Sequence, residues 1–426
     1  MTINQSYYFN FITMKILIYI EQTKIIESMT SHNQVNPGVG GTTYTSARLA
    51  IEIQKEANKN NLDFKITLFT KKPKKTKFLN IDVISEKDAF KKKWDITLLT
   101  GDIIENIYKN KIKINSKRTL IWTRHPFDKN MVKVVRDLKF ELVSVGKNQY
   151  LSNYLLIGAH NHIDNLFCAK RIRKTAFNDE NLLSLKSRED RSKIRIGYMG
   201  ALVPSKGFHL IAENWHEISS SLKKIGKTAI LEVIGGSDLY DFEKNHEFIP
   251  CDKEYGNKIY PHIRNEINKT IFFHGTLNSE RYEIMKLCDI ALFNPRGNGE
   301  AFPASILEWM SLSIPVISCM EYGCADVMTY NKNLIIRNEK EITNKLIQFS
   351  MLKEKEKIEL KKLSFTISNY FSSKQSFIIY QWILLFTQNH KLINEYLEKE
   401  IVKKTIFNRF MLLFKNCIYK FLSLLK

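Results

Sequence analysis

Two glutamates, Glu300 and Glu308, stand where carboxylates could bind the hydroxyl groups of a ligand. Glu300 follows the polar loop NPRGNG, and Glu308 lies inside the apolar run ILEWMSL, which predicts a helix. The apolar segments DIALF and IPVIS on either side predict strands. Strand, loop, helix and strand in this order form a βαβ-like unit, whose ligand crevice lies beyond the carboxyl end of the strand.

The separation of the two carboxylates fits an extended ligand. Helical spacing alone would place them about 12 Å apart, which suits opposite ends of a nucleotide sugar. The alternative is a pair of surface carboxylates, but a charge inside an apolar run is unfavourable unless it has a partner. The pair therefore favours a nucleotide-sugar site.

The start of the predicted helix offers backbone amides between the two glutamates. Amides at a helix N-terminus bind diphosphate oxygens, and they need no metal ion to do so. Pro303 lacks an N–H, although proline is well tolerated in a first helical turn. The remaining donor-binding candidates of this segment are Ala301, Phe302, Ala304 and Ser305.

Lys206 is a candidate for stabilising the charge of a leaving diphosphate. It lies in GALVPSKGF, after a predicted strand and before a predicted helix. Gly200, at the end of that strand, is a further donor-binding candidate. The alternative for Lys206 is an exposed loop lysine.

The first half of the chain contributes a glycine loop and a histidine. In NPGVGGTTY, Gly40 and Gly41 with Thr42 would let the backbone approach a diphosphate or an acceptor closely. His125, in IWTRHPFD, follows a predicted strand and is expected on the cleft side of its domain, or it has only a structural role. Arg124 beside it is a weaker candidate for acceptor or phosphate binding.

Strand and helix patterns alternate along the chain, which is typical of parallel sheets covered by helices. Strands are predicted at KILIYIE, DFKITLFT, WDITLLT, RTLIWTR and FELVSVG, and again at KIRIGYMG, AILEVIGG, TIFFHG, DIALFNP and IPVIS. Helices are predicted from about Thr43, at HLIAENWHEISSSL and at ERYEIMKL. The charged, aperiodic residues 171–193 read as a linker, and 426 residues suffice for two or three domains.

Composition indicates a globular protein of a reducing compartment. Apolar residues make up 44% of the chain, and the six cysteines form no CxxC pair, which argues against a zinc site and a disulfide framework. The N-terminus lacks the pattern of a signal peptide. No segment reaches the roughly 18 apolar residues that span a bilayer. A cytosolic location is expected.

The formal charge of +21 predicts an anionic partner: nucleic acid, an acidic membrane surface or a phosphorylated substrate. In the tail KKTIFNRFMLLFKNCIYKFLSLLK, apolar residues recur every three or four positions with basic residues between them. This pattern predicts a basic amphipathic helix on a membrane surface, with docking on the protein core as the alternative.

Four segments together resemble the retaining glycosyltransferases of family 4. They are NPGVGGTTY, YMGALVPSKGFHLI, LEVIGG and the run from FFHG through DIALFNP to GEAFPASILEWMSLSIPVIS, and the similarity covers roughly residues 14–387. It implies an α/β GT-B fold, with two Rossmann-like domains facing across a cleft and here a C-terminal amphipathic helical extension. The expected divisions are an N-terminal extension (1–13), an acceptor-side domain (14–170), the linker (171–193), a nucleotide-sugar-binding domain (194–364), a crossover helix (365–387) and the basic tail (388–426).

The resemblance also implies roles for the candidate residues. Glu308 would accept hydrogen bonds from the ribose hydroxyls and Glu300 from the transferred sugar, while His125 would bind the donor sugar. Catalysis would fall to Glu300, Lys206 and His125, with no metal ion and no cofactor besides the nucleotide diphosphate sugar. The leaving phosphate oxygen would help to remove the acceptor proton in a front-face reaction.

The chain departs from the family at two positions. Ala201 stands where the family often has arginine, and Pro303 where it commonly has glycine. Lys206 would therefore act alone or with a basic residue from elsewhere. The residues His160, Asn161, His162 and Asp164 superficially suggest a metal cluster. The segment NHID (161–164) matches the turn that ends the family's first domain, so a metal site is not expected there.

The expected partners are a nucleotide sugar, a glycan or lipid-linked acceptor, and the inner face of the plasma membrane; no nucleic acid is expected. Such an enzyme would serve polysaccharide or lipopolysaccharide biosynthesis. One alternative is a nucleotide-sugar 2-epimerase, which would need further acid and base carboxylates and no acceptor. The other is a basic, non-enzymatic protein that binds membranes or nucleic acid.

Overall fold

The structure is a computed structural model of the 426-residue chain. It describes residues 13–31, 37, 39–124, 127, 129–146, 148–149, 151, 192–240, 242–372 and 375–387. His125, nearly all of the expected linker and the whole amphipathic tail lie outside these ranges, so the predictions for them remain predictions.

The first sheet has seven strands in the order β3-β4-β2-β1-β5-β6-β7. All neighbours are parallel except β3 and β4, which are antiparallel. The strands are β1 (Met14–Tyr19), β2 (Phe64–Thr70), β3 (Lys77–Phe78), β4 (Ile81–Ser85), β5 (Trp94–Leu99), β6 (Ser116–Thr123) and β7 (Glu141–Ser144). The five strands predicted for this half are confirmed, whereas β3 and β4 were not predicted.

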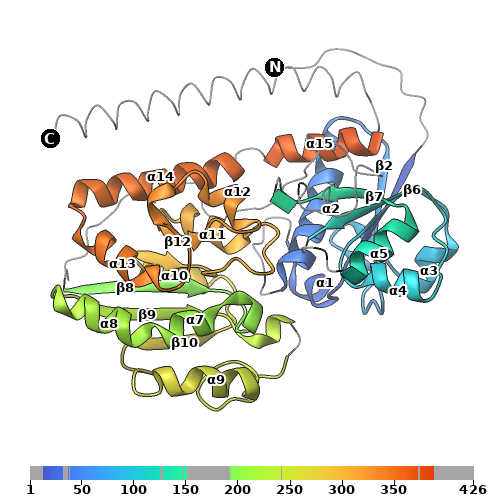
Figure 1. Cartoon of the computed structure of the whole chain (residues 1–426). Helices are drawn as coiled ribbons and strands as arrows, with labels where there is room; N and C mark the ends of the chain where they lie inside the picture. Colours follow the sequence, from blue (N-terminus) through green and yellow to red (C-terminus); the bar gives the residue numbers. More distant parts are fainter. Residues whose placement is uncertain are drawn as a thin grey trace. The chain divides into compact units, whose positions relative to one another are not determined.

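Helices cover both faces of this sheet, as expected when parallel strands are joined by right-handed crossovers (Figure 1). They are α1 (Lys24–Ser28), α2 (Gly41–Lys59), α3 (Glu86–Lys91), α4 (Ile103–Lys109) and α5 (Lys129–Leu138). On the side of α3 to α5, buried side chains such as Phe69, Trp94 and Ile107 form one apolar cluster. Helix α2 packs on the other side, against β1 and β2.

The second sheet has six parallel strands in the order β10-β9-β8-β11-β12-β13. They are β8 (Lys193–Met199), β9 (Thr228–Ile234), β10 (Ile271–Gly275), β11 (Ile290–Leu292), β12 (Val316–Cys319) and β13 (Ile335–Ile336). The five predicted strands of this half are confirmed. Two parallel sheets of this kind confirm the expected α/β fold with two Rossmann-like domains.

Helices α7 to α9 cover one face of the second sheet, while α11, α12 and α14 lie on the other (Figure 1). The elements are η3 (Pro204–Lys206), α7 (Phe208–Glu213), α8 (Trp215–Lys224), η4 (Ser237–Tyr240), α9 (Lys253–Ile263), α10 (Arg281–Lys286), α11 (Ala304–Ser311), α12 (Cys324–Met328), η5 (Lys332–Leu334) and α13 (Glu341–Met351). The single helix predicted at HLIAENWHEISSSL is in fact two, α7 and α8. The break is at Asn214, whose side-chain amide donates to the carbonyl of Leu210 at 2.7 Å.

Two helices follow, α14 (Glu354–Ser372) and α15 (Gln375–Thr387). The chain divides into two compact units, Met1–Ile379 and Tyr380–Lys426, and both sheets belong to the first. Residues 365–387, which were expected to form one crossover helix, contain the end of α14 and all of α15. Within the second unit the rings of Trp382 and Phe386 lie 5.5 Å apart.

Helix α11, which carries Glu308, is seated on the sheet by an aromatic contact with a glycine. The ring of Trp309 lies over Gly197 in β8, and a Cβ added at Gly197 would fall 2.3 Å from it. On the other side of α11, the Ser368 hydroxyl of α14 donates to the carbonyl of Leu307 at 3.2 Å. Both contacts fix α11 relative to the strands.

We predict that Gly197→Ala destabilises the protein by about 1–3 kcal/mol, because the added methyl group would force Trp309 and α11 to move. Urea unfolding measures the change. Lys193→Ala, at the exposed start of the same strand, is the control and should change the free energy of unfolding by less than about 0.5 kcal/mol. Equal stability of Gly197→Ala and the wild type would contradict the packing described.

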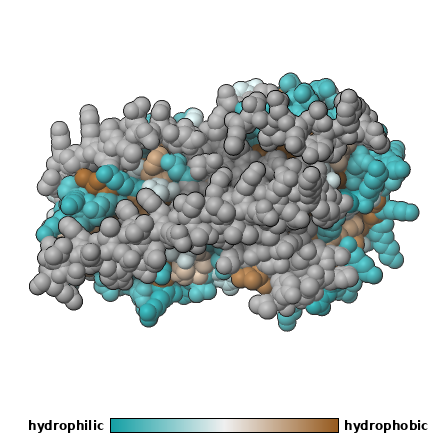
Figure 2. All heavy atoms as spheres, turned by 90° about the horizontal axis from the view of Figure 1, so that it is seen from above, coloured by the Kyte–Doolittle hydropathy of each residue, from teal (hydrophilic) through white to brown (hydrophobic). Residues whose placement is uncertain are grey.

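The described surface carries no sign of a membrane-spanning helix. None of the helices within the described ranges is long and apolar enough to cross a bilayer. In the view of Figure 2, most of the coloured surface is hydrophilic, with small hydrophobic areas between.

Candidate active site

A cavity of about 360 Å³ opens at the carboxyl ends of strands from both sheets. The strand order reverses at β1, which lies between β2 and β5, and at β8, which lies between β9 and β11. Ligand crevices form where the strand order reverses in this way. The residues that line the cavity just after strands are Glu21 (β1), Arg124 (β6), Gly200 (β8), Gly235 (β9), Thr276 (β10) and Phe293 (β11).

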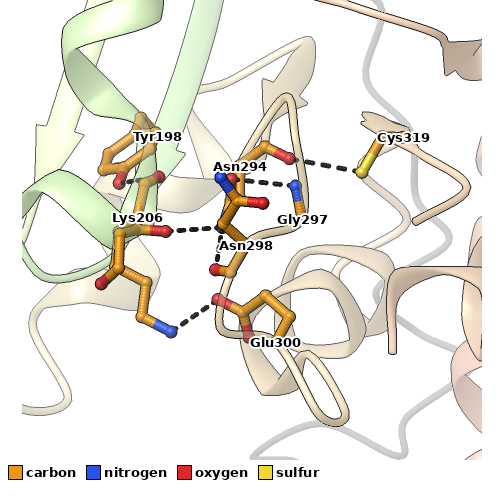
Figure 3. A network of polar contacts seen from close by, with 8 residues as sticks. Tyr198, Lys206, Asn294, Gly297, Asn298, Glu300 and Cys319 are labelled. Atoms are coloured by element: carbon orange, nitrogen blue, oxygen red, sulfur yellow. Dashed lines mark hydrogen bonds and ion pairs between the residues drawn. The ribbon is translucent and has the colours of Figure 1, made fainter. Parts of the chain in front are cut away.

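Lys206 and Glu300 form an ion pair in the wall of this cavity. The Lys206 ammonium donates to Glu300 Oε1 at 2.6 Å, and the side chains are only 15% and 9% exposed. Figure 3 shows the two side chains pointing toward one another from different loops. Tyr198 of β8 adds a hydrogen bond from its hydroxyl to the Lys206 carbonyl at 3.1 Å. The predicted cation and the predicted carboxylate therefore meet at one point.

Asn294 joins the loops that carry the pair. Its side-chain amide donates to the carbonyls of Ser205 at 3.1 Å and Asn298 at 3.0 Å, while its side-chain oxygen accepts from the Gly297 N–H at 3.1 Å. These contacts are drawn in Figure 3. The carbonyl of Glu300 in turn accepts from the Gly323 N–H at 2.8 Å. Asn294, which sequence reasoning missed, thus ties the Glu300 loop to the Lys206 loop.

We expect Asn294→Ala to lower the free energy of unfolding by about 1–3 kcal/mol, because it removes the three side-chain hydrogen bonds that Asn294 makes to Ser205, Asn298 and Gly297. Asn294→Asp keeps the acceptor for Gly297 but loses both donors, so it should be destabilised as well. Urea titration of both variants provides the measurement. The exposed Asn333→Ala is the control, and a stability of Asn294→Ala matching it would refute the role of the side chain.

Glu308 also has a cationic partner in the cavity. Arg281, on α10, donates from Nε to Glu308 Oε2 at 3.3 Å, and the two side chains are 6% and 19% exposed. Burial lowers the pKa of Arg281, but the charge of Glu308 raises it, and the net direction is upward. The predicted need for a partner at Glu308 is met, although the partner itself was not predicted.

The sequence did contain a signal for Arg281. It shares a face of α10 with Met285, whose side chain is buried. A positive charge on the apolar face of a short helix requires a partner. The partner lies on α11, and only the tertiary structure shows it.

The start of α11 faces the cavity as expected. Ala301, Ala304 and Ser305 line it, and the helix begins at Ala304. Pro303 is the N-cap residue, so its missing N–H removes none of the amides of the first helical turn. Phe302 is not among the described lining residues, because its ring is buried against Phe371 with centroids 5.6 Å apart.

The first domain supplies the opposite wall. Gly40, Gly41 and Thr42 line the cavity at the start of α2, where the Gly40 N–H donates to Gln22 Oε1 at 3.1 Å. Arg124 lines it too, and its buried guanidinium donates to the hydroxyls of two α2 residues, at 3.1 Å for Ser46. The same guanidinium lies 3.2 Å from the ring centre of Trp122. Arg124 is therefore held by the helix whose N-terminus faces the cavity.

Cations and carboxylates balance around the cavity. Its charged lining residues are Arg124, Lys206, Arg281, Glu21, Glu300 and Glu308. Arginine and lysine donate to diphosphate oxygens, and ionised carboxylates accept hydrogen bonds from hydroxyl groups. Within the described ranges, no three His, Cys, Asp or Glu side chains form a group that could hold a metal ion. The arrangement suits a ligand that has both a diphosphate and several hydroxyls.

Residues 180–362 match the family described as Glycosyl transferases group 1. The match covers less than half of the chain. The match covers the second sheet and every second-domain residue of the cavity. It confirms the predicted resemblance at the level of group 1 glycosyltransferases, while family 4 and the retaining mechanism stay predictions.

Solved structures share the fold of this chain over most of its length. Anabaena HepE in complex with UDP and glucose is 12% identical, with a TM-score of 0.61 over 88% of this chain and 100% of that one. A glycosyltransferase from Rickettsia africae is 15% identical, with a TM-score of 0.57 over 88% and 98%. The N-terminal domain of Candida albicans trehalose-6-phosphate phosphatase is 12% identical, with a TM-score of 0.58 over 88% and 97%.

At such identities the likeness shows the fold alone, and it confirms the GT-B architecture. A search of curated proteins found no match. The roles of the individual residues therefore have to be argued from the geometry of this chain.

Proposed function

We propose that the chain transfers a sugar from a nucleotide diphosphate sugar to a hydroxyl of a glycan or lipid-linked glycan, with retention of the anomeric configuration and without a metal ion. The observation that carries the proposal is the Lys206–Glu300 ion pair, 2.6 Å long, at a cavity that also contains the start of α11. A cation, helix amides and a carboxylate there match the parts of a diphosphate sugar.

Donor binding would rearrange this pair. The ammonium of Lys206 would turn to the diphosphate, joined by the amides of Ala304 and Ser305 at the positive end of α11. Glu300 would then be available to accept hydrogen bonds from hydroxyls of the transferred sugar. Charge that develops on the leaving diphosphate would meet fixed positive potential, which lowers the barrier to bond cleavage.

The chemistry would consist of one substitution at the anomeric carbon. The bond from this carbon to the diphosphate oxygen breaks as a bond to the acceptor oxygen forms on the same face of the sugar. The acceptor proton passes to the departing phosphate oxygen, so no carboxylate of the protein has to act as a nucleophile. Glu300 and Lys206 orient and stabilise the reacting groups, and His125, outside the described residues, is proposed to bind the donor sugar.

The donor class to test first is the UDP-sugars. Anabaena HepE, which shares the fold, was solved with UDP and glucose. In this chain Glu308 would bind the ribose, and Gly40, Gly41, Thr42 and Gly200 would lie against the donor from both domains.

We predict that Lys206→Met and Glu300→Gln each reduce kcat for sugar transfer by a factor of about 10² or more, since each removes a group that contacts the reacting centre. Release of nucleoside diphosphate from UDP-, GDP- and ADP-sugars in the presence of acceptor glycans gives the rate. NMR of the product gives its anomeric configuration, and the rate should persist in a chelator. Lys223→Met and Glu217→Gln, both exposed on α8, are matched controls.

Other outcomes would point to the alternatives. An inverted product or a chelator-sensitive rate would overturn the retaining, metal-independent mechanism. Conversion of the donor to its 2-epimer with no acceptor present would favour the epimerase. Full biological activity of Glu300→Gln would favour a non-enzymatic binding protein.

We further propose a peripheral position on the inner face of the plasma membrane, where a lipid-linked precursor of polysaccharide or lipopolysaccharide would serve as acceptor. The positive charge of the chain is concentrated in the first domain: residues 13–151 have 26 Lys and Arg against 14 Asp and Glu, whereas residues 192–372 have 23 against 22. Exposed lysines lie near the starts of β1, β2 and β6 of the first sheet: Lys15, Lys65 and Lys117, the last of which is paired with Asp95. Such a surface attracts anionic lipids.

A chain that ends at Thr387 should bind vesicles of anionic phospholipid at least tenfold more weakly than the full chain, because it lacks the predicted basic amphipathic segment. Vesicle sedimentation measures binding. Raised salt should weaken the binding of both chains, since charge attraction is screened, and neutral vesicles are the control. Equal binding of the two chains would contradict a membrane role for the tail.

A further inference from the structure

Four charged side chains of the second domain line the cavity, and the proposed reaction gives a role to Lys206, Glu300 and Glu308. It gives none to the fourth, Arg281. It stands at the start of α10, just after the loop that follows β10. It is buried, yet it lines the cavity beside Thr276 and Leu277. A buried guanidinium at a ligand cavity needs a physical explanation, because desolvation of its charge is unfavourable.

The guanidinium is held by contacts on several sides. Besides its bond to Glu308, Arg281 donates to the backbone carbonyl of Asn278 and to the Tyr282 hydroxyl, the latter at 2.9 Å. Its central carbon lies 4.5 Å from the ring centre of Tyr282. Arginine presents its donors in a rigid planar fork, so these contacts together fix its orientation.

A fixed Arg281 also fixes Glu308. One carboxylate oxygen of Glu308 accepts from Arg281 Nε, and its main chain is held on α11 by the Trp309 and Leu307 contacts. The Glu308 carboxylate, which lines the cavity, is therefore held in one orientation. Two adjacent ribose hydroxyls are best bound by an acceptor whose oxygens do not move, since ordering a free side chain would reduce the affinity.

We propose that Arg281 is a positioning residue for donor recognition: it holds Glu308 in the orientation that binds the two ribose hydroxyls of the nucleotide. This inference rests on the proposed function, because it assumes that the cavity takes a nucleoside diphosphate sugar. It assigns Arg281 no contact with the reacting atoms.

A purely structural ion pair makes a different prediction. If Arg281 served only to stabilise α10 and α11, its loss would weaken the binding of all nucleotides equally. If it positions Glu308, its loss would weaken ribonucleotides and spare nucleotides without the ribose hydroxyls. The ratio of the two affinities therefore separates the roles.

Calorimetric titration of the full chain measures this ratio with UDP and 2′,3′-dideoxy-UDP, and with the same pairs of GDP, ADP and CDP. The wild type should prefer the ribonucleotide of the base that it binds. In Arg281→Gln this preference should fall about tenfold, the size expected for a lost hydrogen bond to a charged group, and Arg281→Lys should recover part of it. Lys286→Gln, at the far end of α10, should keep the wild-type ratio.

Glu308→Gln should also lower the preference, and adding Arg281→Gln to it should lower it little further, since the two residues act as one unit. Thermal unfolding identifies any variant that fails to fold. If Arg281→Gln does not fold, the affinity ratio is measured with Arg281→Lys. An unchanged preference in a folded Arg281 variant would overturn this inference while leaving the proposed function intact. A wild type that binds none of the four ribonucleotides would overturn both.

Discussion

The cavity depends on one constraint, that a poorly hydrated charge must have a partner. Glu300 meets it through Lys206 and Glu308 through Arg281. Each pair joins two elements that are far apart in the sequence, so the pairs connect the loops and helices of the second domain as well as forming the site. Such pairs can exchange partners when a ligand brings its own anionic and hydroxyl groups.

Other contacts in the second domain hold the elements that carry these ion pairs in place. Gly197 allows the ring of Trp309 to approach the sheet closely, and this contact determines how closely α11 approaches β8. Asn294 links the loop before Glu300 to the loop before Lys206. The groups that are proposed to contact a donor are therefore supported by other side chains, which is how a site is preorganised.

Sequence patterns predicted much of this site, and the reasons for the exceptions are physical. Glu300, Glu308 and Lys206 stood out because charges beside apolar strands are rarely placed without a purpose, and the cavity brings all three together. Asn294 did not stand out, since an asparagine in a polar loop is ordinary and its three bonds depend on loops folded against each other. Phe302 was predicted for its backbone amide; it is not among the residues that line the cavity, and its ring is buried against Phe371.

The sequence by itself determined the two parallel sheets, because alternating strand and helix patterns depend on local periodicity. It also indicated an acidic segment at the start of a helix, and this segment lies within the residues that match the group 1 glycosyltransferases. Only the tertiary structure decided which charges are partners, for Arg281 and Glu308 lie on different helices, and no local pattern specifies their 3.3 Å contact. It also decided that Gly197 serves packing, because the reason for a glycine in a strand is the ring that lies against it.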